Sequence, residues 1–345
     1  MNEVSTIGLD IAKSVFQVHG VDDEGTVVIR KRLSRKKVLA FFADLPPCLV
    51  GIEACPSAHH WSRELSKLGH AIGMMPAAYV NAYVKRNKND ANDAEAICEA
   101  VTRPTMRFVP VKSREHQAAL MLHRSRQLLI KQRTMLSNAM RSALAEFGIV
   151  APAGRSGLLR LLDAIEGPDD LGIPSAAWIC LMSMAEQYHN THREVLRLEQ
   201  AIHTWHRSNE LSRRLEEIPG IGPIVATALV GSIPDATVFK SGRSMAAWIG
   251  LVPRQNSSGG KERLGGITKQ GNRHLRWLLV VGAMAVIRHH QRNGFATRPW
   301  LAKLVERKPT RVAAVALANR IARMAWVVMA RGERYRDPLK LAASA

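Results

Sequence analysis

Four acidic residues constrain the fold of this chain more than any other feature. Asp10 and Glu53 belong to two apolar, strand-like runs, and Asp90 and Asp93 lie three residues apart at the start of a predicted helix. A carboxylate on a buried strand must pair, become protonated or bind a cation, because burying it alone is costly. The i, i+3 spacing places Asp90 and Asp93 on one helical face. Four acids without neighbouring cysteine or histidine ligands favour a site for Mg²⁺ or Mn²⁺.

Each acid taken alone also has a structural explanation. Asp90 is a good N-cap, and Asp93 in the first turn gains from the helix dipole, so both explanations stay open for this pair. Asp10 taken alone fits a turn and Glu53 an ion pair, which are the commoner roles for such residues. The conjunction is more informative, because strand, strand, helix is the order in which ribonuclease H-like folds deliver acids to two metal ions for phosphodiester chemistry.

The distribution of charge indicates where a polyanion binds. The chain has 345 residues, of which 46% are hydrophobic, so two or three domain cores are expected. Lys and Arg total 49 against 29 acids, for a net charge of +20. The net charge is 0 over residues 1–102, +8 over 103–145, −3 over 146–253 and +15 over 254–345. The predicted metal domain is therefore neutral, and the two basic segments are the candidates for nucleic-acid contacts.

The chain shows no sign of a membrane or secreted protein. The N-terminus has no signal-peptide pattern, since Glu3 and Asp10 interrupt any apolar core, and no run of 18 apolar residues occurs. We expect no membrane partner and a cytoplasmic, nucleoid-associated protein. The cysteines have no CxxC spacing, which favours reduced thiols in cores over zinc or disulfides. They are Cys48, Cys55, Cys98 and Cys180.

Hydrophobic periodicity predicts an α/β region followed by helices. Strands are expected near 5–20, 26–33, 48–54 and 71–76, and helices near 57–69, 77–87 and 91–102. Beyond these, Ser113–Phe147 contains no Gly or Pro and predicts one long helix. A second helical stretch over 184–216 pairs with it as a coiled-coil arm, within one chain or between protomers, and Ala151–Pro174 forms the connection.

Two glycine-containing segments are candidates for nucleic-acid binding. Gly220 and Gly222 form a turn that opens a helix and resembles the hairpin of helix-hairpin-helix modules, whose backbone N–H groups hold a phosphate. A tight turn between packed helices explains the same residues equally well. Further on, Ser257 and Ser258 precede a glycine pair, in a pattern that is more often only a flexible loop. The cations around this loop that are able to neutralise phosphates are Arg254, Lys261, Lys269, Arg273 and Arg276.

The combination of motifs resembles the DEDD transposases of insertion sequences, the family that includes the pilin-gene invertases and the bridge-RNA-guided recombinases. The motifs span nearly the whole chain in family order, and together they are specific although each is weak alone. They are Gly8-Leu9-Asp10 with Ala12-Lys13, Ile52-Glu53-Ala54, Asn89-Asp90-Ala91-Asn92-Asp93-Ala94, Pro219-Gly220-Ile221-Gly222, and Gly250-Leu251-Val252-Pro253-Arg254 through Ser258-Gly259 to Gly271-Asn272. Asn89 stands where many relatives carry threonine, which leaves the acids themselves unchanged.

The resemblance implies three regions. Residues 1–112 would form a RuvC-like, ribonuclease H-like DEDD metal domain, 113–216 a helical coiled-coil arm with its connection, and 217–345 a mainly α transposase domain. The four acids would bind Mg²⁺ or Mn²⁺ and act in catalysis. The nucleophile would be Ser258, since the family serine precedes glycine. Gly220, Gly222, Arg254, Lys269 and Arg273 would contact nucleic acid.

The function implied by this resemblance is DNA strand cleavage and exchange for an insertion sequence. The partners would be donor and target DNA, an element-encoded guide RNA, and further copies of the chain in a dimer or tetramer. One alternative is a metal-dependent Holliday-junction-type nuclease in which Ser258 is only structural. A second alternative is a non-catalytic nucleic-acid-binding relative, whose acids merely cap and pair.

Overall fold

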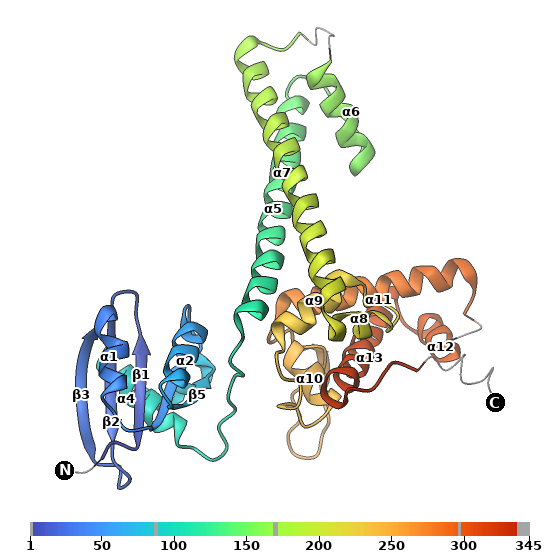
Figure 1. The fold of residues 1–345 in the computed structure, drawn as a ribbon. Coiled ribbons are helices and arrows are strands. Elements are labelled where there is room, and N and C mark those ends of the chain that lie inside the picture. The colour runs from blue at the N-terminus through green and yellow to red at the C-terminus, as the bar shows by residue number, and fades with distance from the viewer. Residues whose placement is uncertain (1–2, 86–88, 168–171, 296–297, 337–345) are drawn as a thin grey trace. The chain divides into compact units, whose positions relative to one another are not determined.

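The computed structural model describes residues 3–85, 89–167, 172–295 and 298–336, and divides the chain into two compact units, Met1–Glu115 and His116–Ala345 (Figure 1). The first unit is a mixed α/β structure and the second is mainly helical. A mixed α/β N-terminal region followed by a helical C-terminal part is what the sequence predicts.

The N-terminal unit is built on one five-stranded mixed sheet in the order β3-β2-β1-β4-β5. The first three strands form an antiparallel meander, whereas β4 and β5 run parallel to β1. The predicted run 5–20 is therefore a hairpin of two strands. The strands are β1 (Thr6–Ile11), β2 (Val15–Val21), β3 (Val27–Ser34), β4 (Leu49–Glu53) and β5 (Ala71–Met75).

Helices cover both faces of this sheet. Alternate residues such as Ile7, Leu9 and Ile52 are fully buried in a core shared with α1 (Val38–Ala43) and α2 (Ala58–Lys67). On the opposite face, α4 (Asp90–Val101) packs with α3 (Ala77–Val80) and the 3-10 turn η2 (Asn81–Tyr83).

One helix prediction for this unit is wrong, and one helix was not predicted. The helix predicted over 77–87 ends at Val80, and residues 86–88 lie outside the described part of the chain. The helix α1 and the 3-10 turn η1 (Arg35–Lys37) before it were not predicted. The apolar face of α1 consists of only Val38 and Phe42, too few positions for a helical period to be recognised.

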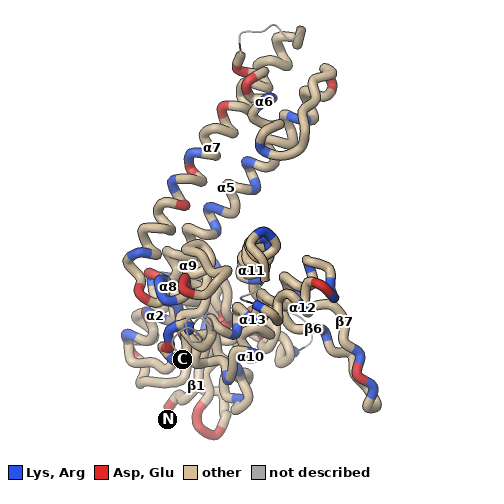
Figure 2. Tube along the Cα trace, turned by 90° about the vertical axis from the view of Figure 1, so that its right-hand side faces the viewer, with Lys and Arg blue, Asp and Glu red and all other residues tan. Residues whose placement is uncertain are grey.

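The second unit begins with a long helical arm. α5 (Arg114–Ala145) confirms the predicted helix, and α7 (Ser175–Ser208) runs beside it (Figures 1 and 2). Arg126 Nε donates to Glu199 Oε1 at 2.9 Å, and Arg133 pairs with His192 Nδ1 at 2.8 Å, so the two helices pair within one chain.

The connection between these helices is itself partly helical. The amphipathic α6 (Arg155–Glu166) buries four leucine and isoleucine side chains against Met140, Leu144 and Leu181 of the paired helices. Residues 151–174 do connect the two arm helices, but the helix α6 within them was not predicted. The second predicted helix begins earlier, at Ser175, and is divided at Asn209, whose side chain caps α8 (Glu210–Glu216) by accepting from Ser212 N–H.

The helices after the arm pack around α13 (Thr310–Arg331). This helix is long and apolar enough to cross a membrane by length and composition. Its small residues Ala314, Ala318 and Ala322 are fully buried against the neighbouring helices, which identifies it as the central helix of the core. The other elements of this core are α9 (Pro223–Ser232), α10 (Gly242–Ile249), α11 (Arg273–Asn293) and α12 (Pro299–Arg307), with a hairpin of β6 (Pro253–Gln255) and β7 (Leu264–Ile267).

Candidate active site

Two of the four acids lie side by side at one edge of the sheet. Leu9 of β1 is opposite Ile52 of β4 in a parallel pair. The next residues, Asp10 and Glu53, therefore lie at neighbouring positions near the carboxyl ends of the two strands. Parallel strands present their carboxyl ends at the same edge, which is why residues 43 positions apart in sequence meet here. Both side chains are partly buried.

A row of glycines brings the helix with the other two acids close to the sheet. Gly8, Gly51 and Gly73 are opposite one another on β1, β4 and β5, directly beneath α4. A Cβ atom at Gly8 would lie 2.0 Å from the carbonyl oxygen of Ala94, and one at Gly73 would lie 2.4 Å from Val101 Cγ2. No other residue fits beneath α4 at Gly8 without moving the helix.

The first turn of α4 carries Asp90 and Asp93. The N-cap is Asn89, whose side chain accepts a hydrogen bond from Asn92 N–H at 2.8 Å. Asp90 is thus not the capping residue, and the capping explanation for it is wrong. Its carboxylate is left available for another purpose, although Asp90 and Asp93 still gain from the helix dipole.

Electrostatics show that the four carboxylates form one cluster. The pKa of Asp10 is raised to about 6, first by burial and then by repulsion from Asp93, Asp90 and Glu53. Within the described residues, no Lys, Arg or His forms an ion pair with any of the four acids. Among the residues that the structure describes, this cluster of negative charge therefore has no ion-pair partner.

The donor set fits a hard divalent cation, which prefers carboxylate oxygens. The side chains do not yet converge on one point, since no three acidic, thiol or imidazole groups in the described part of the chain form a ready metal shell. Carboxylates that repel one another turn apart, so binding requires them to rotate towards a shared ion.

Two supporting features of this cluster were not predicted from the sequence. One is Cys55, which lies close enough to the acids for their charges to act on it. Burial and then the charges of Glu53 and Asp10 raise the pKa of its thiol. The glycine row was also missed, although the sequence carries its signal: glycine precedes the acid by two positions in both Gly8–Asp10 and Gly51–Glu53. Alternate strand residues share a face, so this spacing places a glycine behind each acid.

The two serines lie at the tip of the β6–β7 hairpin, which extends away from the helices of its unit (Figure 2). Lys261 N–H donates to the Ser258 carbonyl at 3.1 Å, and the two residues between them, Gly259 and Gly260, both have positive φ, as a type I′ turn requires. The segment is therefore a hairpin turn. Ser257 Oγ accepts from Arg263 N–H at 3.2 Å, whereas Ser258 Oγ forms no hydrogen bond with a described residue.

Motif residues on either side of the serines form the base of this hairpin. Gly250 ends α10 with positive φ, and a Cβ there would lie 2.2 Å from the carbonyl oxygen of Gln270. A Cβ at Gly271 would lie 1.8 Å from the carbonyl oxygen of Trp248. Asn272 then caps α11 by accepting from two backbone N–H groups. The two glycines hold the ends of the hairpin together.

The predicted phosphate-binding cations differ in availability. Arg276 is engaged, since its Nη1 donates to the carbonyls of Ile249 and Gln270 at 2.9 Å. Arg254, Lys269 and Arg273 are accessible and form no ion pair with a described residue. These three remain candidates for phosphate contacts.

The glycines of the predicted helix-hairpin-helix turn have different surroundings. Gly220 has positive φ and packs against α11, where a Cβ on Gly282 would lie 1.9 Å from the Gly220 carbonyl oxygen. Gly222 precedes α9 and has open space around it. Helix packing explains Gly220, and Gly222 is the more accessible of the two.

Comparison with known proteins defines the class of molecule that carries these features. Residues 7–149 match the model of a DEDD transposase domain, and residues 212–298 match that of the transposase IS116/IS110/IS902 family. A probable family 20 transposase of Pseudomonas aeruginosa is 46% identical over 96% of this chain and 99% of its own length. The transposases for insertion sequence elements IS1328 of Yersinia enterocolitica and IS1111A of Coxiella burnetii are each 37% identical, over 96% and 97% of this chain and 98% and 92% of their own lengths.

The chain belongs to the IS110/IS116/IS902 family of transposases. It is an insertion-sequence transposase, an enzyme of DNA recombination whose DEDD domain implies dependence on a divalent metal.

Proposed function

We propose that this transposase cleaves and exchanges DNA strands with its four clustered acids as metal ligands and Ser258 as the nucleophile. The observation that carries the proposal is the cluster itself: burial and three neighbouring carboxylates raise the pKa of Asp10 to about 6, and no Lys, Arg or His among the described residues forms an ion pair with the four acids. A site that keeps such repulsion is suited to a divalent cation.

In this proposal Asp10, Glu53, Asp90 and Asp93 hold Mg²⁺ or Mn²⁺, and α4 sets the spacing between the strand acids and the helix acids. The bound ions would supply stabilisation of the negative charge that develops on the scissile phosphate. Asp10 must lose its proton before it binds a cation, so its raised pKa sets the pH at which the site becomes competent.

The serine step forms a bond from Ser258 Oγ to phosphorus while the bond from phosphorus to one deoxyribose oxygen breaks. The proton leaves the hydroxyl, and the departing deoxyribose oxygen gains one. The phosphoserine ester keeps the energy of the broken bond for rejoining to a second strand. Two features favour Ser258 over Ser257: its hydroxyl has no partner in the described residues, and it directly precedes the turn glycines. Arg254, Lys269 and Arg273 would neutralise the phosphate.

The partners we propose are donor and target DNA, a guide RNA encoded by the element, and further copies of this chain in a dimer or tetramer. The basic segments over 103–145 and 254–345 would bind nucleic-acid backbone, with Gly220 and Gly222 in a helix-hairpin-helix-like contact. We place this activity in the cytoplasm, on nucleoid DNA.

We also propose that residues 1–112 form a ribonuclease H-like, RuvC-like domain, 113–216 a coiled-coil arm, and 217–345 the transposase domain with the serine hairpin. The strand order β3-β2-β1-β4-β5, with acids at the ends of β1 and β4, supports the first assignment. The pairing of α5 with α7 supports the second.

The acids are tested by a cleavage assay on the full chain with labelled donor and target DNA, RNA transcribed from the element's flanking sequence, and Mg²⁺ or Mn²⁺. We expect cleavage that requires the metal and falls at least a hundredfold in Asp10→Asn and Asp93→Asn. Asp23→Asn, an exposed turn substitution, is the matched control and should keep full activity. Equal cleavage by Asp10→Asn and the control would refute the proposed role of the acids, and binding without any cleavage would indicate a non-catalytic relative.

A further inference from the structure

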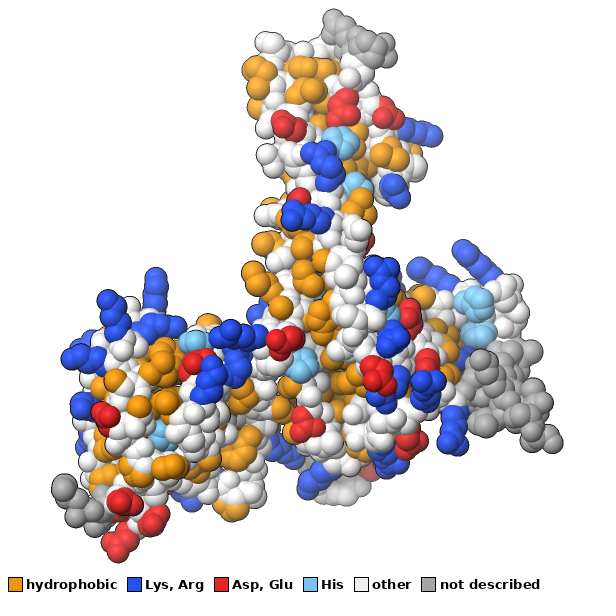
Figure 3. Space-filling view, in the orientation of Figure 1, with side chains coloured by type: hydrophobic (Ala, Val, Ile, Leu, Met, Phe, Trp, Pro, Cys, Tyr) orange, Lys and Arg blue, Asp and Glu red, His pale blue; other side chains and the backbone are white. Residues whose placement is uncertain are grey.

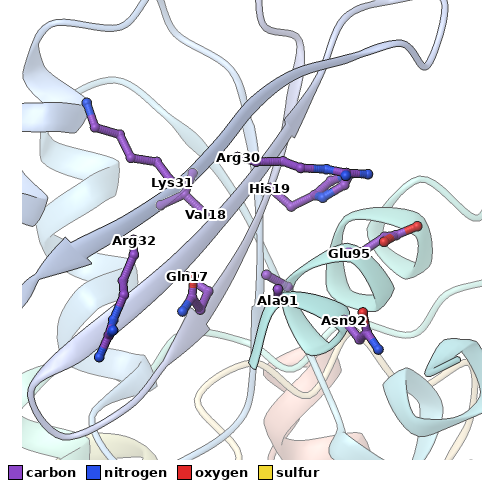
Figure 4. Close-up of a pocket in the computed structure, with 10 residues that line it drawn as sticks. Gln17, Val18, His19, Arg30, Lys31, Arg32, Ala91, Asn92 and Glu95 are labelled. Atoms are coloured by element: carbon purple, nitrogen blue, oxygen red, sulfur yellow. The ribbon is translucent and has the colours of Figure 1, made fainter. Parts of the chain in front are cut away.

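A cationic cavity lies next to the acid cluster and is not explained by metal binding. It has a volume of about 240 Å³ and is formed between the strands β2 and β3 and one side of α4 (Figure 4). The residues that line it are Gln17, Val18, His19, Arg30, Lys31, Arg32, Ala91, Asn92, Ala94 and Glu95. The surface of the N-terminal unit over β3 is also rich in Lys and Arg (Figure 3).

Strand register connects this cavity to the acids. Asp10 of β1 is opposite Gln17 of β2, which is opposite Arg32 of β3, so these three side chains form one row on one face of the sheet. Two residues along the strands, Gly8, His19 and Arg30 form the adjacent row on the same face. The cavity is thus the lateral continuation of the acid site across the sheet.

The cavity presents positively charged groups and hydrogen-bond donors, and the only carboxylate among its described lining residues is that of Glu95. His19 is 6% exposed, and its ring forms no hydrogen bond with a described residue although it lines the cavity. Burial lowers the pKa of His19, with Glu95 opposing and Arg30 reinforcing the effect, so the ring is neutral at pH 7 and keeps one N–H to donate. Glu95 is compensated by Lys85 at 2.6 Å, and neither Arg30 nor Arg32 forms an ion pair with a described residue.

We infer that this cavity binds the phosphodiester backbone of the DNA strand that is cut at the acids; the inference rests on the proposed function. Arg32 lies two strands from Asp10, which is about 10 Å at ordinary strand spacing. A stacked nucleic-acid strand covers that distance in about three nucleotides. Arg30 and Arg32 contact phosphates, and His19, Gln17 and Asn92 donate hydrogen bonds to the same strand.

The chain supplies a matched control on the same strand. Lys31 lies between the two arginines, but its side chain points away from Arg30 and His19 (Figure 4) and its ammonium lies 5.2 Å from the centre of the Phe41 ring on the other face. Replacing Lys31 removes one positive charge from the same edge strand and leaves the side chains of Arg30 and Arg32 in place.

The first test measures binding of the full chain to a DNA oligonucleotide, without divalent metal, as a function of salt concentration. The double variant Arg30→Gln, Arg32→Gln should lower the slope of log K against log salt by about 2, since each phosphate contact contributes about one unit, and Lys31→Gln by much less. The second arm of the test uses an RNA oligonucleotide of the same sequence. If the double variant lowers the salt slope for RNA binding by about 2 and leaves that for DNA binding unchanged, the cavity binds the guide RNA and its assignment to DNA is overturned. Equal slopes for the double variant and Lys31→Gln would mean that the arginines merely protect an edge strand.

The second test locates the DNA next to the acids. Fe²⁺ in place of Mg²⁺, with ascorbate and peroxide, should produce hydroxyl radicals that cleave the bound strand over a few nucleotides in the wild type and Lys31→Gln. In the double variant this cleavage should become weaker or extend over more nucleotides, because the strand is no longer held next to the acids. Unchanged cleavage there would overturn the inference, whereas wild-type protein that cleaves no better than Asp10→Asn would instead contradict the metal site of the proposed function.

Discussion

Asp10 is the residue on which the account of the active site depends most. Its carboxyl is partly buried and is repelled by three others, so the folded protein holds its pKa near 6, above the ordinary value of 3.8. Because the pKa is raised, the folded state favours the proton: the contribution to stability is present below about pH 4 and is lost as pH rises through 6. The metal-free protein therefore carries a destabilising charge at neutral pH.

Asp10→Asn should remove that charge and stabilise the metal-free protein. We expect its melting temperature at pH 7.5 to rise by roughly 2–5 °C, measured by calorimetry in EDTA. Adding Mg²⁺ or Mn²⁺ should then stabilise the wild type but leave the variant unchanged. A variant that melts below the wild type in EDTA would show that the carboxylate makes a stabilising contact, contrary to this account.

The affinity of the site for metal should follow the proton on Asp10. Below pH 6 the proton competes with the cation, so affinity should fall about tenfold for each further unit of pH, and be nearly constant above pH 7. Titration calorimetry with Mn²⁺ between pH 5 and 8 measures this profile. A flat profile across pH 6 would show that Asp10 is not a ligand.

Helix α4 depends on the glycine row for its position. Gly8→Ala should push α4 away from β1, because the new methyl carbon would lie 2.0 Å from the Ala94 carbonyl oxygen. We expect a loss of about 3 kcal/mol in the free energy of unfolding, and weaker metal binding in the fraction that folds. Gly266→Ala, with open space around the added carbon, is the control and should change stability little. Equal denaturation midpoints for the two variants would contradict the close packing of α4 on the sheet.

The sequence predicted elements with long or strongly alternating patterns and missed those whose signal is not local. The acids, the strands that carry them and the helix α5 follow from spacing along the chain, which periodicity reports directly. The glycine row depends on register between three strands, and α1 and α6 are short helices stabilised by their tertiary contacts. Cys180 was expected in a core but is exposed, while Cys48 and Cys98 are buried as predicted; the residue type alone does not decide burial.

The two units of the chain should respond to acid in opposite directions. In the C-terminal unit, the His123 ring lies 2.8 Å from Thr227 Oγ1, and its pKa is lowered to about 4 by burial and then by His274 and Arg126. A lowered histidine pKa means that stability is fully present above about pH 6.5 and is lost as pH falls towards 4. In the N-terminal unit, protonation of Asp10 over the same range relieves repulsion.

Hydrogen exchange resolved by peptide measures this difference. From pH 7 to pH 4.5, protection factors should fall for α9 and α11 and hold or rise for β1 and β4, after correction for intrinsic exchange. His123→Asn should reduce the pH dependence of the C-terminal unit alone. A parallel fall in both units, unaffected by the substitution, would contradict these assignments.

The most direct test of the account is to find the covalent intermediate. The full chain is incubated with element-derived RNA, Mg²⁺ and labelled donor and target DNA, and any protein-linked DNA is digested and mapped by mass spectrometry in the wild type, Ser257→Ala and Ser258→Ala. The account predicts a nucleotide ester on Ser258 that persists in Ser257→Ala and disappears in Ser258→Ala and in Asp10→Asn. Free hydrolysed ends that neither serine substitution affects would contradict it, and would assign the chemistry to the acids alone, as in a metal-dependent junction nuclease.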